Sequence, residues 1–396
     1  MYDLIAGGKH ADWNRALSVA EYIEDVLTHC GWPTGEIVEP EKDLAKHLGT
    51  GCAVVRQALR LLEMRGVGTV RRGTSGGLIL ARPSPQLLVS AMSQHLRWLG
   101  LRHEQIAATR LRVQSHQWAS SNFNYTVNDD GRAVSKPLAL LLAVLSQLDR
   151  AEPDAADELS APDTDYHTHQ QAIYVANLLA GEITYARCVT GYRLGSLSEL
   201  SYHYGVGLPT FTQSVRLLAD FGVLKGRRGK SGGLFLQLPK EEAIVRRINS
   251  QLLALQLSIE ESEEFVWFIN TLHARAAAER AVVTAGISAA MDALAHASGE
   301  CFQYYWTLLQ REIAEAANIP VLHMFVRCFA AYNIRAFRPK GPSQHNEMAA
   351  ALQASRDVVN AIANGEPANA EIAQSRCHEI IENCKSVNRF VTLVRH

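Results

Sequence analysis

The octapeptide "RRGTSGGL" at residues 71–78 returns almost unchanged as "RRGKSGGL" at residues 227–234, 156 positions further along the chain. At the same shift the correspondence continues without a gap over roughly sixty residues. It aligns, for example, Gly66 with Gly222. A match of this length indicates a duplicated unit.

The repeated unit has the hydrophobic pattern of three helices followed by a hairpin. Apolar residues recur at helical spacing within residues 14–29, and a short helix is predicted at 39–49. A longer helix follows at 52–66, ended by a glycine. Two β-prone stretches then flank a glycine-rich tip at 73–77, which predicts a β-hairpin, the wing. This order predicts a winged helix-turn-helix, in a chain that is mainly α with small β-wings.

Residues 35–80 resemble the DNA-binding domain of the GntR family of bacterial transcription regulators. The second copy, residues 191–236, is more divergent but keeps the same frame. The resemblance depends on the E-x-x-L-A of the second helix, the V-R-x-A-L of the recognition helix, the Leu-Glu-x-x-Gly that ends this helix, and the R-G-x-x-G-G wing. Outside the wing, these motifs fall on Glu41, Leu44, Ala45, Val55, Arg56, Ala58, Leu59, Leu62, Glu63 and Gly66.

The resemblance implies that each recognition helix lies in the major groove of DNA and that each wing lays cations beside phosphates. Where the family usually has Ser-Arg at the start of that helix, this chain has Gly51-Cys52 and Gly207-Leu208. We therefore expect base readout that is weaker than, or different from, the family pattern, with a larger part for the wings. The candidate DNA-binding residues are Arg56, Arg60, Arg71, Arg72, Thr74, Ser75, Thr210, Thr212, Gln213, Arg216, Arg227, Arg228 and Lys230.

The helical segments after the two wings resemble the FCD domain, the all-α ligand-sensing half of one GntR subfamily. Between them, residues 149–165 carry seven acidic residues against one basic residue, which indicates an acidic linker. The predicted order is a first winged helix at 1–82, a shortened FCD-like segment at 83–148, the linker at 149–165, a second winged helix at 166–239, and an FCD-like effector-binding and dimerisation domain at 240–396.

FCD domains often hold a divalent metal through one Asp and three His. Three of the four matching positions here are Trp306, Gln310 and Ser355, and only His378 is retained. First-row divalent ions need several protein ligands, so we expect no metal and no cofactor. A pocket for an effector, such as a small organic acid or acyl compound, is a weaker expectation. Its candidate residues are Trp306, Gln310, His323, Arg327, Tyr332, Ser355 and His378.

Composition and short motifs limit the classes of protein to which the chain could belong. The net charge of −1 gives no overall signature of nucleic-acid binding. Seven cysteines without a C-x-x-C pair favour reduced thiols, and the absence of a secretion signal or membrane span predicts a cytoplasmic protein. No P-loop, G-x-S-x-G, H-E-x-x-H or G-x-G-x-x-G is present, so we do not expect an enzyme.

These observations predict a regulator that binds double-stranded DNA through two winged helices in one chain. The two copies would pair within the chain and read an imperfect palindrome, because their recognition helices differ. A homodimer through the helical bundles is a further expectation, and the sequence does not separate repression from activation. The alternative is a degenerate winged-helix and helical-bundle protein that serves as a scaffold for protein assembly, without specific DNA readout.

Overall fold

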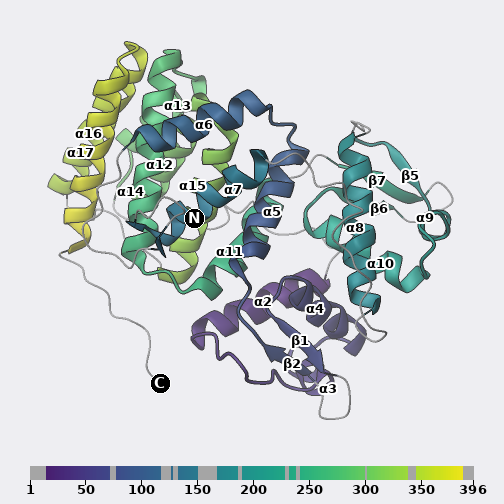
Figure 1. Cartoon of the computed structure of the whole chain (residues 1–396). Helices are drawn as coiled ribbons and strands as arrows, with labels where there is room; N and C mark the ends of the chain where they lie inside the picture. Colours follow the sequence, from purple (N-terminus) through teal and green to yellow (C-terminus); the bar gives the residue numbers. More distant parts are fainter. Residues whose placement is uncertain are drawn as a thin grey trace. The chain divides into compact units, whose positions relative to one another are not determined.

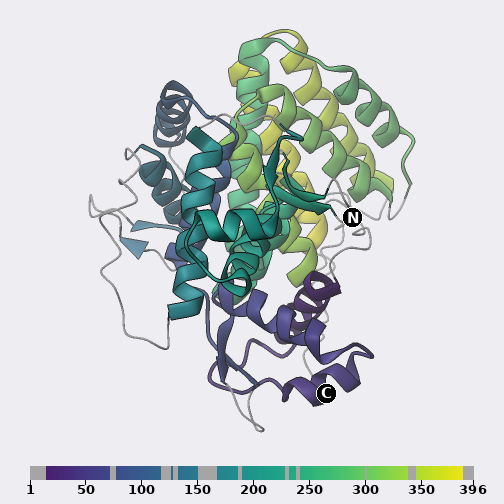
Figure 2. The ribbon, with the colours of Figure 1, turned by 90° about the vertical axis from the view of Figure 1, so that its right-hand side faces the viewer.

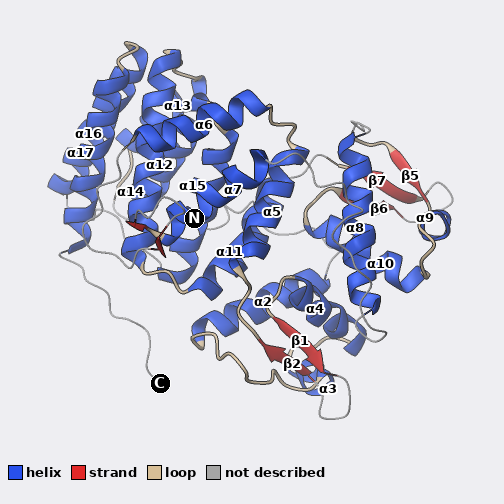
Figure 3. Ribbon diagram, viewed as in Figure 1, coloured by secondary structure: helices blue, strands red, loops and turns tan. Residues whose placement is uncertain are grey.

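The structure is a computed structural model that describes residues 15–71, 77–116, 126–127, 133–149, 167–185, 190–227, 232–237, 241–298, 301–337 and 345–386. The chain divides into two compact units. The winged unit takes its described residues from Ala6–His103 and Ala143–Gln256, and the helical unit takes them from Glu104–Leu142 and Leu257–His396. Mainly α structure with small antiparallel sheets confirms the predicted fold class (Figure 3).

The first winged helix follows the predicted order of elements (Figures 1 and 2). Its helices pack through buried apolar side chains that include Ile23, Val55 and Leu62, and the strands pair antiparallel. The bounds are α2 Arg15–His29, α3 Glu41–His47, α4 Cys52–Met64, β1 Gly68–Arg71 and β2 Gly77–Leu80.

The second winged helix repeats this order and adds one strand, which gives a sheet with the order β5-β7-β6. Its core includes Phe211, Leu218 and Leu234. The bounds are α8 His167–Tyr185, β5 Arg193–Gly195, α9 Leu197–His203, α10 Leu208–Asp220, β6 Leu224–Arg227 and β7 Gly233–Leu236.

Matching positions of the two copies have the same backbone geometry. The amide of Gly35 donates to Leu80 O at 2.9 Å, and the amide of Gly191 donates to Leu236 O at 2.8 Å. After the recognition helices, glycines 66 and 222 have φ of 75° and 74°, a left-handed conformation that favours glycine. At the shift of 156 residues, these positions therefore match in backbone geometry as well as in sequence.

Each wing is followed by a helix that remains in the winged unit, α5 Pro85–Trp98 after the first and α11 Glu241–Leu255 after the second. These two helices contact each other and bury apolar residues such as Leu96 and Leu252. We call residues 15–98 module 1 and residues 167–255 module 2. The compact units thus do not follow the predicted boundaries at 82/83 and 239/240, because α5 and α11 pack with the winged helices.

The helical unit is built around α12, which contacts α14, α15, α16 and α17. The alanine-rich end of α12, including Ala274, Ala277 and Ala278, is buried and lets neighbouring helices approach closely. The bounds are α6 His103–Ser115, β3 Thr126–Val127, β4 Ala133–Val134, α7 Lys136–Asp149, α12 Ile259–Arg280, α13 Ala285–Ala295, α14 Cys301–Ala317, α15 Pro320–Phe337, α16 His345–Ala363 and α17 Pro367–Ser386.

The segment predicted at 83–148 is divided between the two units, since α5 lies in the winged unit and α6 lies almost entirely in the helical unit. Its helix α6 is joined to α12 by Arg112, whose Nη1 and Nη2 donate to Glu279 at 3.0 and 2.5 Å. The predicted linker at 149–165 lies outside the described residues, except for Asp149. Within the described residues, none of the helices is both long and apolar enough to cross a membrane.

We predict that Gly68→Ala destabilises the first winged helix by roughly 1–3 kcal/mol. A Cβ at Gly68 would lie 2.2 Å from Ile79 O, a backbone atom of the paired strand. Gly226→Ala is the matched control, because no atom lies within 4 Å of its added Cβ. Urea unfolding followed by circular dichroism measures both, and equal unfolding midpoints for the two variants would contradict the packing described here.

Candidate nucleic-acid interface and ligand pocket

Both recognition helices begin at a glycine. Gly51 is the N-cap of α4 and Gly207 is the N-cap of α10, each with extended backbone and without a side-chain capping bond. The first-turn amides of a helix have no partner within the helix, and its N-terminus favours anions. Neither helix end carries an N-cap side chain over these amides, so both ends are suited to an anion.

In module 1, the exposed Arg56 is held at the start of the recognition helix by Glu41 of α3. Its Nε donates to Glu41 Oε2 at 3.0 Å, and its Nη2 donates to Oε1 at 2.6 Å. The hydrogen bonds that Arg56 donates to Glu41 raise the pKa of Arg56. Glu41 thus fixes the orientation of the guanidinium. A DNA group that binds Arg56 must either bind beside Glu41 or displace its carboxylate.

In module 2 the position that matches Arg56 holds the uncharged Thr212. Thr212 donates its hydroxyl to Leu208 O at 2.7 Å, within its own helix. Leu208 is 47% exposed and Tyr202 is 89% exposed. Thr210, one of the sequence candidates, is only 6% exposed and lies in the core of the module. This burial argues against a contact between Thr210 and DNA, and we omit Thr210 from the proposal below.

The two matching arginines, Arg60 of α4 and Arg216 of α10, lie close enough to influence each other. Burial lowers the pKa of Arg216, and the positive charge of Arg60 lowers it further. Both side chains are half-buried, as is Gln213. These three candidates therefore present less surface to a partner than Arg56 does.

The described wing arginines lie at the ends of the wing strands. Arg71 ends β1 and Arg227 ends β6, and both are exposed. The guanidinium of Arg227 lies 4.5 Å from the centroid of the Phe235 ring, which orients it by a cation–π contact. The other wing candidates lie outside the described residues: Arg72, Thr74, Ser75, Arg228 and Lys230.

The first wing is tied to its recognition helix by Glu63. The carboxylate of Glu63 accepts a hydrogen bond from the amide of Val70 at 2.8 Å. The matching residue of module 2 is Ala219, whose side chain cannot accept this hydrogen bond. The sequence shows Glu63 as part of a motif, whereas its role as a wing anchor depends on a contact that only the structure gives.

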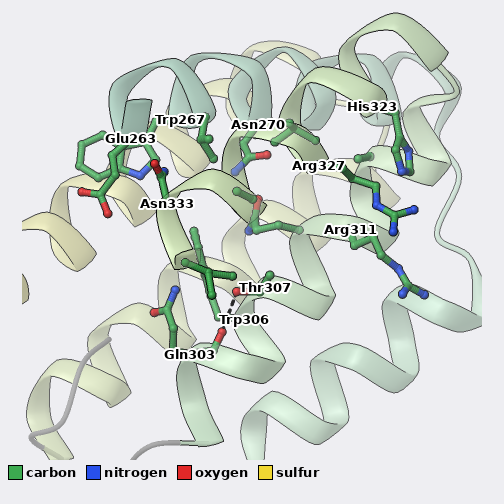
Figure 4. Close-up of a pocket in the computed structure, with 16 residues that line it drawn as sticks. Glu263, Trp267, Asn270, Gln303, Trp306, Thr307, Arg311, His323, Arg327 and Asn333 are labelled. Carbon is green, nitrogen blue, oxygen red and sulfur yellow. Dashed lines mark hydrogen bonds between the residues drawn. The ribbon is translucent and has the colours of Figure 1, made fainter. Parts of the chain in front are cut away.

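A pocket lies in the helical unit between α12, α14 and α15 (Figure 4). Two indole rings, Trp267 and Trp306, contribute apolar surface. The guanidinium groups of Arg311 and Arg327 and the imidazole of His323 gather at one end (Figure 4). Arg311 also forms ion pairs with Glu312 at 3.0 Å and Glu315 at 3.5 Å. The full lining comprises Glu263, Val266, Trp267, Asn270, Gln303, Trp306, Thr307, Gln310, Arg311, Ala314, His323, Val326, Arg327, Ala330, Asn333 and Ile334.

Several polar atoms of the pocket lining are buried without a hydrogen-bond partner among the residues that the structure describes. They include Oε1 of Gln303, Oε1 of Gln310 and Oδ1 of Asn333. Buried polar atoms in folded proteins nearly always have a partner, either protein or solvent or ligand. The lining therefore combines unused hydrogen-bonding capacity with apolar walls, which is typical of small-molecule sites.

Four of the seven pocket candidates from the sequence line this pocket: Trp306, Gln310, His323 and Arg327. The remaining three do not line it, for separate reasons. Tyr332 is buried and donates to Leu257 O at 2.8 Å, and Ser355 is buried and donates to Ala351 O at 2.8 Å. His378 stacks on Trp267 with ring centroids 5.5 Å apart, so it packs against a residue of the pocket lining without lining the pocket itself.

The sequence candidates omitted the contribution of α12. Glu263, Trp267 and Asn270 follow each other at spacings of four and three residues, which places them on one face of this helix. That spacing is the signal that could have identified them. Within the part of the chain that the structure describes, no three His, Cys, Asp or Glu side chains form a group that could hold a metal ion.

Comparison with known proteins gives limited matches. No family model matches the chain. It is 31% identical over 117 residues to a Mycobacterium gastri protein whose name, given provisionally, is HTH-type transcriptional regulator RmpR. This alignment covers 28% of the present chain and 43% of that relative. The structure of Streptococcus agalactiae GntR aligns with a TM-score of 0.38 and 17% identity, covering 54% of this chain and 99% of that one.

We predict that Glu63→Ala loosens the first wing, because the amide of Val70 loses its carboxylate acceptor. Amide hydrogen exchange at Val70 should become faster, while exchange in β6 of module 2, where Ala219 matches Glu63, stays unchanged and serves as the internal control. Unchanged exchange at Val70 in the variant would show that the carboxylate does not hold the wing.

Proposed function

We propose that this chain is a DNA-binding transcription regulator that contacts an operator through two winged helices. The main support is that both modules combine an N-terminal helix end without a side-chain cap and an exposed arginine at the edge of the wing, namely Arg71 and Arg227. These are the two elements by which winged helices meet bases and phosphates. The relative's name, although matched over part of its length, agrees with this class.

The two modules would read different half-sites. Arg56 gives module 1 a charged donor for base edges or phosphates, whereas module 2 presents Leu208 and Thr212 at the corresponding turns. An apolar side chain in the major groove contacts thymine methyl groups, and a guanidinium favours guanine. The operator is therefore an imperfect palindrome, bound by paired copies that arose by duplication.

We further propose that the helical unit is an FCD-like sensor, as in regulators of the GntR type, that works without a metal. The end of the pocket that holds Arg311, His323 and Arg327 suits the carboxylate of a small organic acid or acyl compound, and the two indoles suit its apolar part. Binding of the effector would shift the arrangement or mobility of the DNA-binding modules. The unit also provides the surface for a homodimer.

A second candidate function is an assembly scaffold without specific DNA readout. The specific observation in its favour is the partly apolar face of module 2, where Tyr202 and Leu208 are exposed. The salt dependence of DNA binding separates the two functions, because phosphate contacts release counterions.

We predict salt-dependent binding of the chain to the promoter of its own gene. In a fluorescence anisotropy titration, Arg71→Gln with Arg227→Gln should weaken binding and reduce the slope of log affinity against log salt by up to about 2, since each phosphate that is no longer neutralised accounts for roughly 0.9. Arg280→Gln with Arg376→Gln removes two exposed charges of the helical unit and is the matched control. Equal slopes for the two double variants would favour the scaffold.

We predict that benzoate and hexanoate stabilise the helical unit in thermal unfolding, whereas benzamide and hexanamide, which are neutral, do not. The stabilisation should increase with ligand concentration as mass action requires. Arg327→Gln should abolish it, because this substitution removes a cation of the pocket. Arg280→Gln, outside the pocket lining, should leave it unchanged. Equal stabilisation by acids and amides would refute the anion site.

A further inference from the structure

The two modules meet at a buried charge cluster of Glu24, Arg65, Asp220 and Arg247, each at most 7% exposed. Arg65, at the end of α4, donates from Nη1 to both carboxylate oxygens of Glu24 at 2.9 Å. It also donates to Asp220, from Nε at 3.2 Å and from Nη2 at 2.8 Å. Asp220 in turn accepts from Nη1 of Arg247 at 2.8 Å. Two acids and two bases thus neutralise each other across the contact.

Neighbouring opposite charges favour the ionised forms of Asp220 and Arg65, whereas burial lowers the pKa of Arg247. Burial alone would raise the pKa of Asp220, but the adjacent Arg65 and Arg247 lower it to about 2. Burial also opposes the charge on Arg65, and the neighbouring carboxylates outweigh it, so its pKa is raised. A buried charge that loses its partner is strongly destabilising. Glu24 and Arg65 balance each other within module 1, as Asp220 and Arg247 do within module 2. The hydrogen bonds from Arg65 to Asp220 join the two pairs, so separating the modules would remove a partner from each of these two buried charges.

None of the four cluster residues has a like residue at the matching position of the other module. At the shift of 156 positions, Glu24 corresponds to Ala180 and Arg65 to Phe221. Asp220 and Arg247 correspond, in the same way, to Met64 and Ala91. The outer ion pair between Glu21 and Arg246, at 3.3 Å, corresponds to Asn177 and Ser90. The charged part of the contact is thus complementary between unlike modules and not between like ones, whereas the apolar pair Leu96 and Leu252 is the same on both sides.

Aromatic contacts show the same asymmetry. Phe221 of module 2 packs edge-on against Trp98 of module 1, with ring centroids 5.2 Å apart, and Arg247 lies 4.2 Å from its centroid. At the shift of 156 positions, Phe221 corresponds to Arg65 and Trp98 corresponds to Ala254. In a symmetric pair of two copies of module 1, Arg65 would lie against Arg65 and would have no Asp220 as a partner. In a pair of two copies of module 2, Phe221 would have no Trp98 to pack against.

We propose that this surface selects an unlike module, so that a winged unit always contains one module 1 and one module 2 and a like module from a second chain is rejected. The two modules of one chain are held at high effective concentration by the chain itself, which makes them each other's partners. This inference rests on the pairing of the modules within the proposed function, and it is independent of DNA binding.

The test exchanges the cluster residues between the two modules of the full chain. Pairing of the modules is measured by energy transfer between a dye on module 1 and a dye on module 2. Donor and acceptor dyes are placed at Tyr22 of module 1 and Tyr202 of module 2, which are 55% and 89% exposed. A like-with-like chain receives the module 1 residues in module 2. Its substitutions are Ala180→Glu, Asp220→Met, Phe221→Arg and Arg247→Ala. A reversed chain also receives Glu24→Ala, Met64→Asp, Arg65→Phe and Ala91→Arg.

We expect a severalfold loss of energy transfer in the like-with-like chain and its recovery in the reversed chain, where the charges are complementary again. Circular dichroism and near-ultraviolet spectra show whether the modules remain folded, and Arg280→Gln controls for a change of charge elsewhere. Transfer at the wild-type level in the like-with-like chain would overturn the proposal. So would a reversed chain that is folded but unpaired. The assay contains no DNA, so it tests the pairing of the modules even if the chain does not bind DNA.

Discussion

The arrangement of the winged unit depends on one buried ion pair, the double hydrogen bond between Arg65 of module 1 and Asp220 of module 2. Both residues lie at the ends of recognition helices, Arg65 just after α4 and Asp220 as the last residue of α10. Desolvating such charges is costly unless their geometry is well satisfied. A contact that joins the ends of both recognition helices therefore restricts where their beginnings can lie, and hence the spacing of any half-sites.

The helical unit is assembled from segments that alternate with the winged unit along the chain. The chain leaves the winged unit after His103, returns within α7 and leaves again after Gln256. The pocket residues come from α12, α14 and α15, all from the later part of the chain, while α6 is held to α12 by Arg112 and Glu279. An effector that reorders these helices therefore acts on segments continuous in sequence with both modules, which suits the proposed regulation.

Much of this architecture could be predicted from the sequence, because its signals are local. Helical spacing, the glycines after each recognition helix and the repeated wing sequence predicted the elements and their order in both copies. The compact units could not be predicted, since nothing local shows that α5 packs against α11 or that α6 joins α12. Arg65 was not singled out either, because its partners Glu24 and Asp220 lie 41 and 155 residues away in sequence.

The candidate site was only partly predictable for the same reason. Arg56 and the wing arginines followed from the motif, but the burial of Thr210 and the half-burial of Arg216 depend on how the modules fold and meet. In the pocket, alignment with the metal-binding pattern located Trp306 and Gln310. It also included Ser355, whose hydroxyl is satisfied within its own helix by Ala351 O. Residues of α12 were missed because the pattern did not extend to that helix.

The central claim is that two unlike winged helices, held as one pair, read one duplex. Selection of bound sequences from a random DNA library by the full chain, followed by hydroxyl-radical footprinting, tests it most directly. We expect two different half-sites at one fixed spacing, both protected on the same duplex. A single half-site, or two half-sites at freely varying spacing, would contradict it.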